Sequence, residues 1–550
     1  MMQHQQMQSQ ARAIGIASAI WAGSIFLSRI MGLVREQIIG RTLGASRQAD
    51  LYFASFTLPD FLNYLLAAGA LSIVFIPMFI EHLERGDEKR CWQAFSVIAN
   101  FIVLAGGILI ALLLIFTRPL AAVVAPGFSA GEIETLARLI RIILPAQLFH
   151  VIGGLLSAAL QAQNLHTLPA MAPLVYSLGI IAGGMIGAHY PGFEADGFAW
   201  GVLAGSVLGP FALPLCGCLK TRFRWYPLVS LSHPDLWHYL RLSFPIMIGF
   251  SIVAVDEWII KNQASYLTAG ALSYLQYGRT LMKVPIGVFG MALGVASYPT
   301  ISRLVTARCV VEAYGVLTRA VRLMLLATFA AQVCLTVAGF EAAYLSWGIF
   351  SARFTIADAQ TTATVLGVLC LGLCGWAAQA MISRGFYALG STWLPTLVGT
   401  AVAFAGLPLY VILRQQWGAI GLAIASAAAI ISYVLLLGAL QHRRFQREAV
   451  ATGATLKGVP GMLDGALRLG IAAMGAIGIG MAARAMLLHF VPGFDLTVIL
   501  LRATVLCVLG TTVYLVLARL FGVRELVEIE RILARSFRVS TLMPIHARRR

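Results

Sequence analysis

Residues 94–116 read AFSVIANFIVLAGGILIALLLIF and contain no Asp, Glu, Lys or Arg. At about 1.5 Å of rise per residue, a helix of this length crosses a hydrocarbon core roughly 30 Å thick. Such a segment must be helical in lipid, because a helix satisfies its own backbone hydrogen bonds. The stretch therefore predicts a transmembrane helix.

The rest of the chain has the same character. Of its 550 residues, 59% are hydrophobic and 11% are charged, against the roughly 25% charged residues of soluble domains. We predict an all-α polytopic membrane protein with about fourteen transmembrane helices, since apolar runs of spanning length recur throughout. The expected spans are 14–34, 51–80, 94–116, 136–161, 168–189, 197–217, 242–267, 271–299, 314–340, 358–382, 393–413, 418–440, 466–488 and 497–520.

The net charge of +17 is interpreted as the positive-inside bias of a membrane protein and not as a nucleic-acid-binding surface. With the N-terminus inside, the cations gather in the even-numbered loops and the tail: Arg85, Lys89, Arg90, Lys220, Arg222, Arg224, Arg303, Arg308, Arg384, Arg443, Arg444, Arg447 and Arg548–Arg550. Both termini are therefore expected in the cytoplasm. Arg41 and Arg47, in the first outer loop, break this rule and require a local counter-charge or another local reason.

Motifs for soluble chemistry are missing from the sequence. It contains no GxxxxGK[ST], HExxH or GxSxG, so neither nucleotide hydrolysis nor these hydrolytic sites are predicted. The eight cysteines lie mostly in apolar runs and indicate neither disulfides nor a metal site. We expect a transporter without a cofactor, driven by Na⁺, H⁺ or the membrane potential.

An internal repeat divides the chain. Ala70-Leu71-Ser72 with Pro77 matches Ala292-Leu293-Gly294 with Pro299, and two further matches recur at nearly the same offset. Six helices per unit give two lobes of parallel topology, as in alternating-access transporters. The expected domains are an N-terminal lobe (1–230), a C-terminal lobe (231–445), helices 13 and 14 (446–522) and a basic cytoplasmic tail (523–550). We expect the tail, from about residue 524, to be dispensable for transport.

Ionisable residues at bilayer depth are costly and mark candidate sites. They are Arg29, Asp60, Asp256, Lys261, Arg279 and Lys283. Arg29, Arg35, Arg279 and Lys283 lie on leading helices of the two lobes, which predicts a cleft for an anion such as phosphate. The alternative is that each cation neutralises a nearby carboxylate. Asp256 could couple transport to an ion gradient, or could pair with Lys261 or an arginine.

Other intramembrane polar residues are given structural roles. Arg138, Arg141, Arg319, Arg322 and Arg502 lie near predicted helix ends, and we expect them to snorkel to the interface. His150 is expected to be a hydrogen-bonded packing residue. The small residues of helices 6 and 12 are expected to serve close helix packing.

The segment Leu27-Ser28-Arg29-Ile30-Met31-Gly32-Leu33-Val34-Arg35-Glu36, running on to Leu43-Gly44-Ala45 and Ala49-Asp50, resembles the opening signature of the MurJ (MviN) family of lipid II flippases. These belong to the superfamily of multidrug, oligosaccharidyl-lipid and polysaccharide exporters. The likeness continues through Ala125-Pro126-Gly127-Phe128, Pro285-x-Gly287-Val288 and Ser383-Arg384-Gly385-Phe386-Tyr387. It covers nearly the whole chain.

The resemblance implies a cationic cavity for the diphosphate and sugar headgroup, and a groove on helices 13 and 14 for the polyprenyl tail. By position, Arg29, Arg35 and Arg279 match the family's cavity arginines, and Asp50 matches its helix 2 aspartate. The residues expected to line the diphosphate and headgroup cavity are Arg29, Arg35, Asp50, Asp60, Asn63, Arg279 and Lys283. The chain departs from the family pattern at Asn63 and Ala68, where an arginine and a glutamate are common. It also has Gly278 where the family often has an aspartate before the arginine. Positions that resemble a sodium site hold Ile260, Gln379 and Ser383, so Asp256 and Gln379 are the candidates for coupling.

The resulting hypothesis is a flippase of the bacterial inner membrane. It moves lipid II, the undecaprenyl-diphosphate-linked peptidoglycan precursor, from the cytoplasmic to the periplasmic leaflet, with membrane lipids and other cell-wall synthesis proteins as partners. One alternative is a flippase for an O-antigen or exopolysaccharide unit. A cation-coupled drug exporter fits a basic cleft less well, and a non-transporting scaffold leaves the deep charges without a purpose.

Overall fold

A computed structural model of the chain describes residues 27–66, 74–221, 223–228, 230–391, 393–456, 461–523 and 525–526. Within these ranges the ordered elements are helices, and none is a strand. Residues 14–26 of the first expected span, the motif at 70–72, Ala68 and the basic tail beyond 526 lie outside the described residues.

The chain forms two compact units. Unit 1 consists of residues 1–273 and 350–355, and unit 2 of residues 274–349 and 356–550. The expected lobe boundary near residue 230 follows the repeat, whereas the units follow packing. The two divisions differ because α12 (Pro234–Ala264) packs against α3, α5 and α6 of unit 1. The lobe boundaries themselves stay a prediction.

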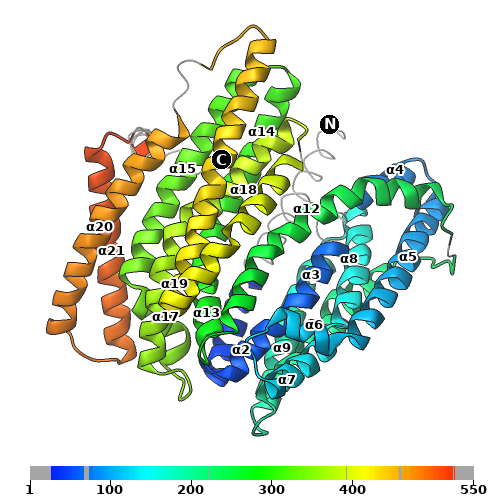
Figure 1. The fold of residues 1–550 in the computed structure, drawn as a ribbon. Helices are drawn as coiled ribbons and strands as arrows, with labels where there is room; N and C mark the ends of the chain where they lie inside the picture. Colours follow the sequence, from blue (N-terminus) through cyan, green and yellow to red (C-terminus); the bar gives the residue numbers. More distant parts are fainter. Residues whose placement is uncertain are drawn as a thin grey trace, which may run out of the picture. The chain divides into compact units, whose positions relative to one another are not determined.

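Unit 1 begins with a helix over residues 27–43. It continues with α2 (Arg47–Ser55), α3 (Thr57–Leu66), α4 (Ile76–Glu84), α5 (Glu88–Ile115), α6 (Thr117–Val124), α7 (Ala130–Ile143), α8 (Ala146–Ala162), α9 (Thr167–Gly187), α10 (Glu194–Ser206), the π-helix η2 (Val207–Ala212), α11 (Leu213–Leu219) and α12 (Figure 1). Its core includes an aromatic cluster in which Trp92 of α5 contacts Phe79, Phe95 and Phe223 edge to face.

Unit 2 is built around α15 (Val310–Val337), which packs against α14, α17, α18, α20 and α21. Its elements are α13 (Ala271–Pro285, of which the first turn belongs to unit 1), η3 (Ile286–Gly290), α14 (Met291–Thr306), α15, α16 (Gly339–Ala343), η4 (Tyr344–Gly348), α17 (Ile356–Leu369), η5 (Cys370–Gly372), α18 (Leu373–Ala388), α19 (Trp393–Ala451), α20 (Met462–Phe490) and α21 (Leu496–Leu520). The last two run side by side in Figure 1.

Nine helical stretches among the described residues are long and apolar enough to cross a membrane. One of them, α19, contains a break at Gly418, whose φ of 57° and ψ of −130° are not helical. Gly418 is the first residue of the expected span 418–440 and follows the expected span 393–413, so α19 comprises two helices. The chain is thus a multi-pass membrane protein, and the exact number of fourteen spans stays a prediction.

Glycines bring α9 and α10 into close contact, as expected for helix 6. A Cβ on Gly183 would lie 2.4 Å from the carbonyl oxygen of Gly197, and one on Gly179 would lie 2.5 Å from the Cα of Gly205. Glycines four residues apart allow helix backbones to approach closely in lipid. His150 on α8 is likewise a packing residue: its Nδ1 lies 3.0 Å from the carbonyl oxygen of Ala146 and its ring meets Tyr176 edge to face.

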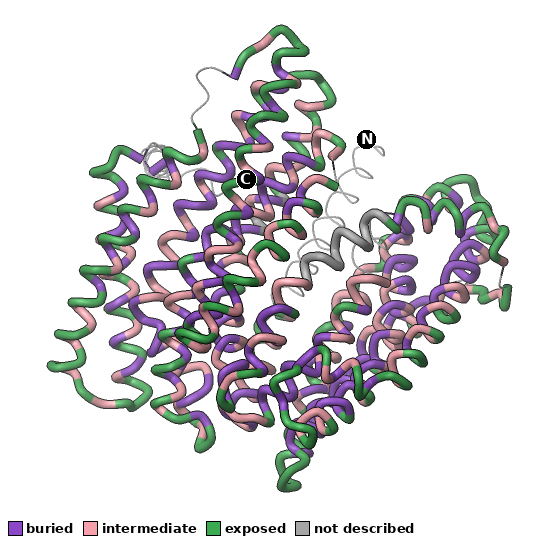
Figure 2. The backbone as a smooth tube through the Cα atoms, in the orientation of Figure 1, coloured by how far each residue is buried: buried purple, intermediate pink, exposed green. Residues whose placement is uncertain are grey.

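Large apolar side chains are exposed along the outer helices. Figure 2 shows exposed residues along α20 and α21, where Leu467, Met474 and Val508 are each more than half exposed. An aqueous protein rarely exposes such continuous apolar surface. These faces therefore contact lipid.

Two arginines expected to snorkel are instead buried, and that expectation was wrong. Arg322 is 4% and Arg502 is 1% exposed. Arg322 pairs with Glu525 at 2.5 Å, and Arg502 lies 3.7 Å from Glu341. Counter-charges that are distant in sequence hold both side chains inside unit 2, where a charge remains only if it is paired.

The pairing of Arg322 redefines where the dispensable tail begins. We expect a chain ending at residue 526 to be as stable as the full chain. A chain ending at residue 523 should lose about 3 kcal/mol, because Arg322 would be left buried without Glu525. Thermal unfolding of the two truncations in detergent measures the difference. Equal melting temperatures would show that this ion pair stabilises nothing.

Candidate functional site

The helix over residues 27–43 carries the first two candidate cations. Arg29 is exposed and Arg35 is half-buried. The Arg35 Nη2 donates to the Glu36 Oε1 at 2.7 Å. The neighbouring carboxylate thus offsets part of the Arg35 charge.

A second group of candidates lies on α3 and α12 of unit 1. Asp60, in the first turn of α3, lies 4.0 Å from the Nζ of Lys261, which is 7% exposed. Asn63 and Asp256 are half-buried. Asp256 and Lys261 are five residues apart on α12, and residues at that spacing do not share a helix face. Lys261 thus lies beside the carboxylate of Asp60, and the role of Asp256 stays a separate question.

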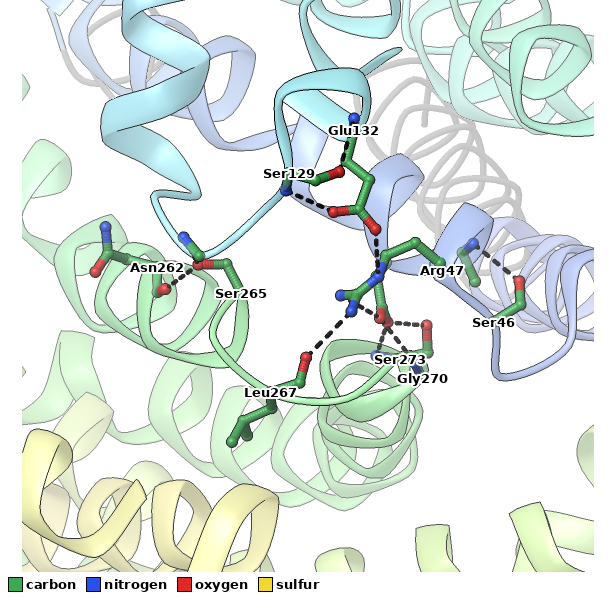
Figure 3. A network of polar contacts seen from close by, with 12 residues as sticks. Ser46, Arg47, Ser129, Glu132, Asn262, Ser265, Leu267, Gly270 and Ser273 are labelled. Atoms are coloured by element: carbon green, nitrogen blue, oxygen red, sulfur yellow. Dashed lines mark hydrogen bonds and ion pairs between the residues drawn. The ribbon is translucent and has the colours of Figure 1, made fainter. Parts of the chain in front are cut away.

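Asp50 on α2 is 1% exposed and caps the start of α13. Its carboxylate accepts hydrogen bonds from the backbone nitrogens of Gly270 and Ser273, both at 2.8 Å, and from the Ser273 hydroxyl at 2.6 Å (Figure 3). The first backbone N–H groups of a helix lack partners in their own helix and carry partial positive charge. Asp50 therefore fixes the entry of the helix that carries Arg279 and Lys283.

Arg47, one turn before Asp50 on α2, contacts three other segments of unit 1. Its Nε lies 2.9 Å from Glu132, and its Nη2 donates to the carbonyl oxygen of Leu267 at 3.2 Å (Figure 3). Its guanidinium also lies over the ring of Phe128. Glu132 is held by the capping box it forms with Ser129. The counter-charge that the sequence required for Arg47 is therefore present.

Arg279 and Lys283 lie one turn apart on α13 of unit 2. Arg279 is 4% exposed, and its Nη2 donates to the Ser426 hydroxyl of α19 at 3.1 Å. Lys283 is exposed, and Gln379 on α18 is half-buried. The sequence marked Ser426 only as part of the repeat and missed its contact with Arg279. A hydroxyl can orient the planar guanidinium, which binds phosphate through paired N–H groups.

Arg384 on α18 is a further cation that the sequence counted only as a loop charge. It is half-buried, and a Cβ added to Gly294 of α14 would lie 1.2 Å from its Nη1. Gly294 therefore provides the space that the guanidinium occupies. The spacing of the repeat gave Gly294 as a motif residue, but no sequence pattern linked it to Arg384.

Together the helical fold and the apolar spans define a multi-pass membrane protein, and the family to which it belongs is one of transporters. The chain has the fold of a solved lipid II flippase MurJ in an inward closed conformation, with a TM-score of 0.71, 22% identity, and coverage of 92% of this chain and 98% of that one. It is also similar in fold to an inward-facing multidrug MATE transporter of the MOP superfamily, with a TM-score of 0.65 and 14% identity. That match covers 76% of this chain and 95% of the transporter.

The family is shown by the sequence comparison. The model of the family described as lipid II flippase MurJ matches residues 39–501, and the chain belongs to this family. Lipid II flippase MurJ of Burkholderia cenocepacia is 28% identical over 77% of this chain and 83% of its own length. A protein of Thermotoga maritima, described as a probable lipid II flippase MurJ, is 28% identical over 75% of this chain and 82% of its own length.

Proposed function

We propose that this chain is a flippase that moves lipid II from the cytoplasmic to the periplasmic leaflet of the bacterial inner membrane. The observation that carries the proposal is the family match over residues 39–501, supported by relatives with that described activity. Two-lobed transporters of this kind work by alternating access. Both termini are then cytoplasmic, in keeping with the basic even-numbered loops.

The substrate diphosphate is assigned to the cationic residues. Arg29, Arg35 and Arg279, with Lys283, supply positive charge on the leading helices of the two repeats. Asp60 and Asn63 contribute polar contacts to the headgroup, and Asp50 acts by fixing α13 in position. The exposed apolar faces of α20 and α21 are suited to the polyprenyl tail, because such faces bury hydrocarbon.

Complementation of a strain depleted of its own MurJ tests the function directly. We expect this chain to restore growth and to restore lipid II exposure on the periplasmic leaflet. The contrary outcome has two parts. Lipid II would still accumulate on the cytoplasmic leaflet, but the chain would restore export of another polyprenyl-diphosphate oligosaccharide in a strain that lacks the flippase for that oligosaccharide. That result would make the other glycan the proposed substrate. Failure in both strains would contradict a flippase.

Energy coupling is assigned to Asp256, a carboxylate within the expected span 242–267, with Gln379 as the second candidate. We expect Asp256→Asn to keep substrate binding and to lose the dependence of flipping on the ion gradient, since the substitution keeps the shape and removes the charge. A leaflet-accessibility assay with and without an ionophore measures this. Reduced substrate affinity, with residual flipping that still responds to the ionophore, would show that Asp256 only pairs with another charge.

A further inference from the structure

The segment Phe350–Thr355, here called the strap, packs with unit 1, whereas the residues on both sides of it belong to unit 2. It follows η4 and precedes α17, which begins at Ile356. The strap lies between the expected spans 314–340 and 358–382, in a loop predicted to be periplasmic. The chain therefore leaves unit 2 for a few residues and then returns to it.

Arg353 makes two polar contacts between the strap and the rest of unit 1. Its Nη2 donates to the Glu194 Oε1 at 2.9 Å, and its Nη1 donates to the carbonyl oxygen of Thr42 at 3.0 Å. Glu194, in the first turn of α10, is 3% exposed. Hydrogen bonds between ionised groups are stronger than neutral ones, and more so when one partner is buried.

The hydrogen bonds of Ser351 fold the strap and also join it to the helix over residues 27–43. The Ser351 hydroxyl accepts from the backbone nitrogens of Arg353 at 3.1 Å and of Phe354 at 3.0 Å, and donates to the carbonyl oxygen of Arg41 at 3.0 Å. Phe354 is 1% exposed, and the Arg41 guanidinium lies over the ring of Phe350. These contacts give the strap a single shape when it is bound.

The turn that receives the strap is shaped by Gly44. Its φ is +65°, and a Cβ at this position would lie 2.4 Å from the carbonyl oxygen of Arg353. Glycine tolerates this backbone conformation without steric cost. Gly44 therefore supplies the turn and leaves the space that the Arg353 carbonyl oxygen occupies. The backbone of Arg353 thus packs against Gly44, while its side chain binds Glu194.

We propose that the strap is a latch of the transport cycle, bound to unit 1 in the state described and released when the cavity opens to the periplasm. Both ends of the strap continue directly into unit 2, so rearrangement of the lobes during alternating access pulls on it. Contacts made in one state and lost in the other set the ratio of the two states. The latch rests on the proposed transport activity, but not on lipid II as the substrate.

The test uses the full-length protein in membranes, with its eight natural cysteines replaced by serine and a single reporter, Asn63→Cys, in the candidate cavity. An impermeant maleimide added from the periplasmic side reports outward opening. We expect Arg353→Gln and Glu194→Gln each to raise the labelling rate by about five- to tenfold, the lower end of typical coupling between two states. The double variant should add little to either one, because both remove the same ion pair.

The ion pair between Arg138 and Asp196 provides a matched control. Its atoms lie 2.8 and 2.9 Å apart and join α7 to α10 within unit 1, two residues from Glu194, without touching the strap. We expect Arg138→Gln to leave the labelling rate unchanged. An equal rise in this control would overturn the latch, because it would show general loosening of unit 1.

A further variant keeps the test decisive if Arg353→Gln or Glu194→Gln fails to fold. Ser351→Ala keeps the charges but removes both the internal hydrogen bonds of the strap and its hydrogen bond to the Arg41 carbonyl oxygen, so it should also raise labelling. Unchanged labelling in Arg353→Gln, Glu194→Gln and Ser351→Ala, with melting temperatures near the parent's, would overturn the proposal. If the parent failed to flip lipid II, the proposed substrate would fall, while the labelling comparison would still decide the latch.

Discussion

Arg279→Ala is expected to abolish flipping while the protein remains in the membrane at normal levels. Arg279 is buried, and its guanidinium is oriented by Ser426 at 3.1 Å. Losing two hydrogen bonds to a phosphate, each about 1.5–3 kcal/mol, lowers the rate at least roughly a hundredfold. Arg29→Ala should have the same effect, and Arg279→Lys should recover only part of the activity, because an ammonium lacks the planar fork.

The leaflet-accessibility assay measures these variants, with Arg303→Ala as the control. Arg303 is exposed at the end of α14 in the same unit, so its loss should leave flipping near the parent level. Parent-level activity in both Arg29→Ala and Arg279→Ala would eliminate the cationic cavity. An equal loss in the control would show that flipping responds to total charge and not to these sites.

Glu341→Gln should produce the largest loss of stability in unit 2. Glu341 on α16 is fully buried, with the Nε of Arg502 at 3.7 Å and the Nε of Arg484 at 3.8 Å. Removing its charge leaves the buried Arg502 and the partly buried Arg484 without the carboxylate that they share, and breaking a buried ion pair in this way costs about 3–5 kcal/mol. Because the arginines come from α20 and α21, these helices should separate from α16 first.

Thermal unfolding and amide hydrogen exchange of α20 and α21 measure this effect. Asp464→Asn is the matched control, since it removes a carboxylate from the exposed pair with Arg468 on α20, which is worth at most about 1 kcal/mol. Similar melting temperatures in the two variants would show that the Glu341 cluster contributes no more than a surface pair.

The helical fold could be predicted from the sequence because the length of an apolar run is a local property of the chain. Residues 94–116 required a helix, and the two spans on either side of Gly418 were separated correctly. The family signature also lay in contiguous segments such as 27–36. These features depend on neighbours in the chain, which is why reading along the chain recovered them.

The partners of individual charges could not be predicted in the same way. Ser426 is 147 positions from Arg279 and Glu525 is 203 from Arg322, so no periodicity connects them. Arg502 was placed near a helix end correctly, but its burial depends on Glu341 of a different helix. Arg47 was the exception that gave a signal, because a cation in an outer loop had to have a local partner.

The break in α19 limits where this protein can be engineered. Gly418 lies at φ 57° and ψ −130°, and a Cβ on Gly421 would lie 1.9 Å from the carbonyl oxygen of Leu413. The two helices thus meet in a hairpin with almost no loop. A topology reporter or epitope tag inserted there would split the hairpin and report on a misassembled protein. The turn around Gly192, where an added Cβ meets no atom within 4 Å, offers an insertion point for mapping the membrane sides.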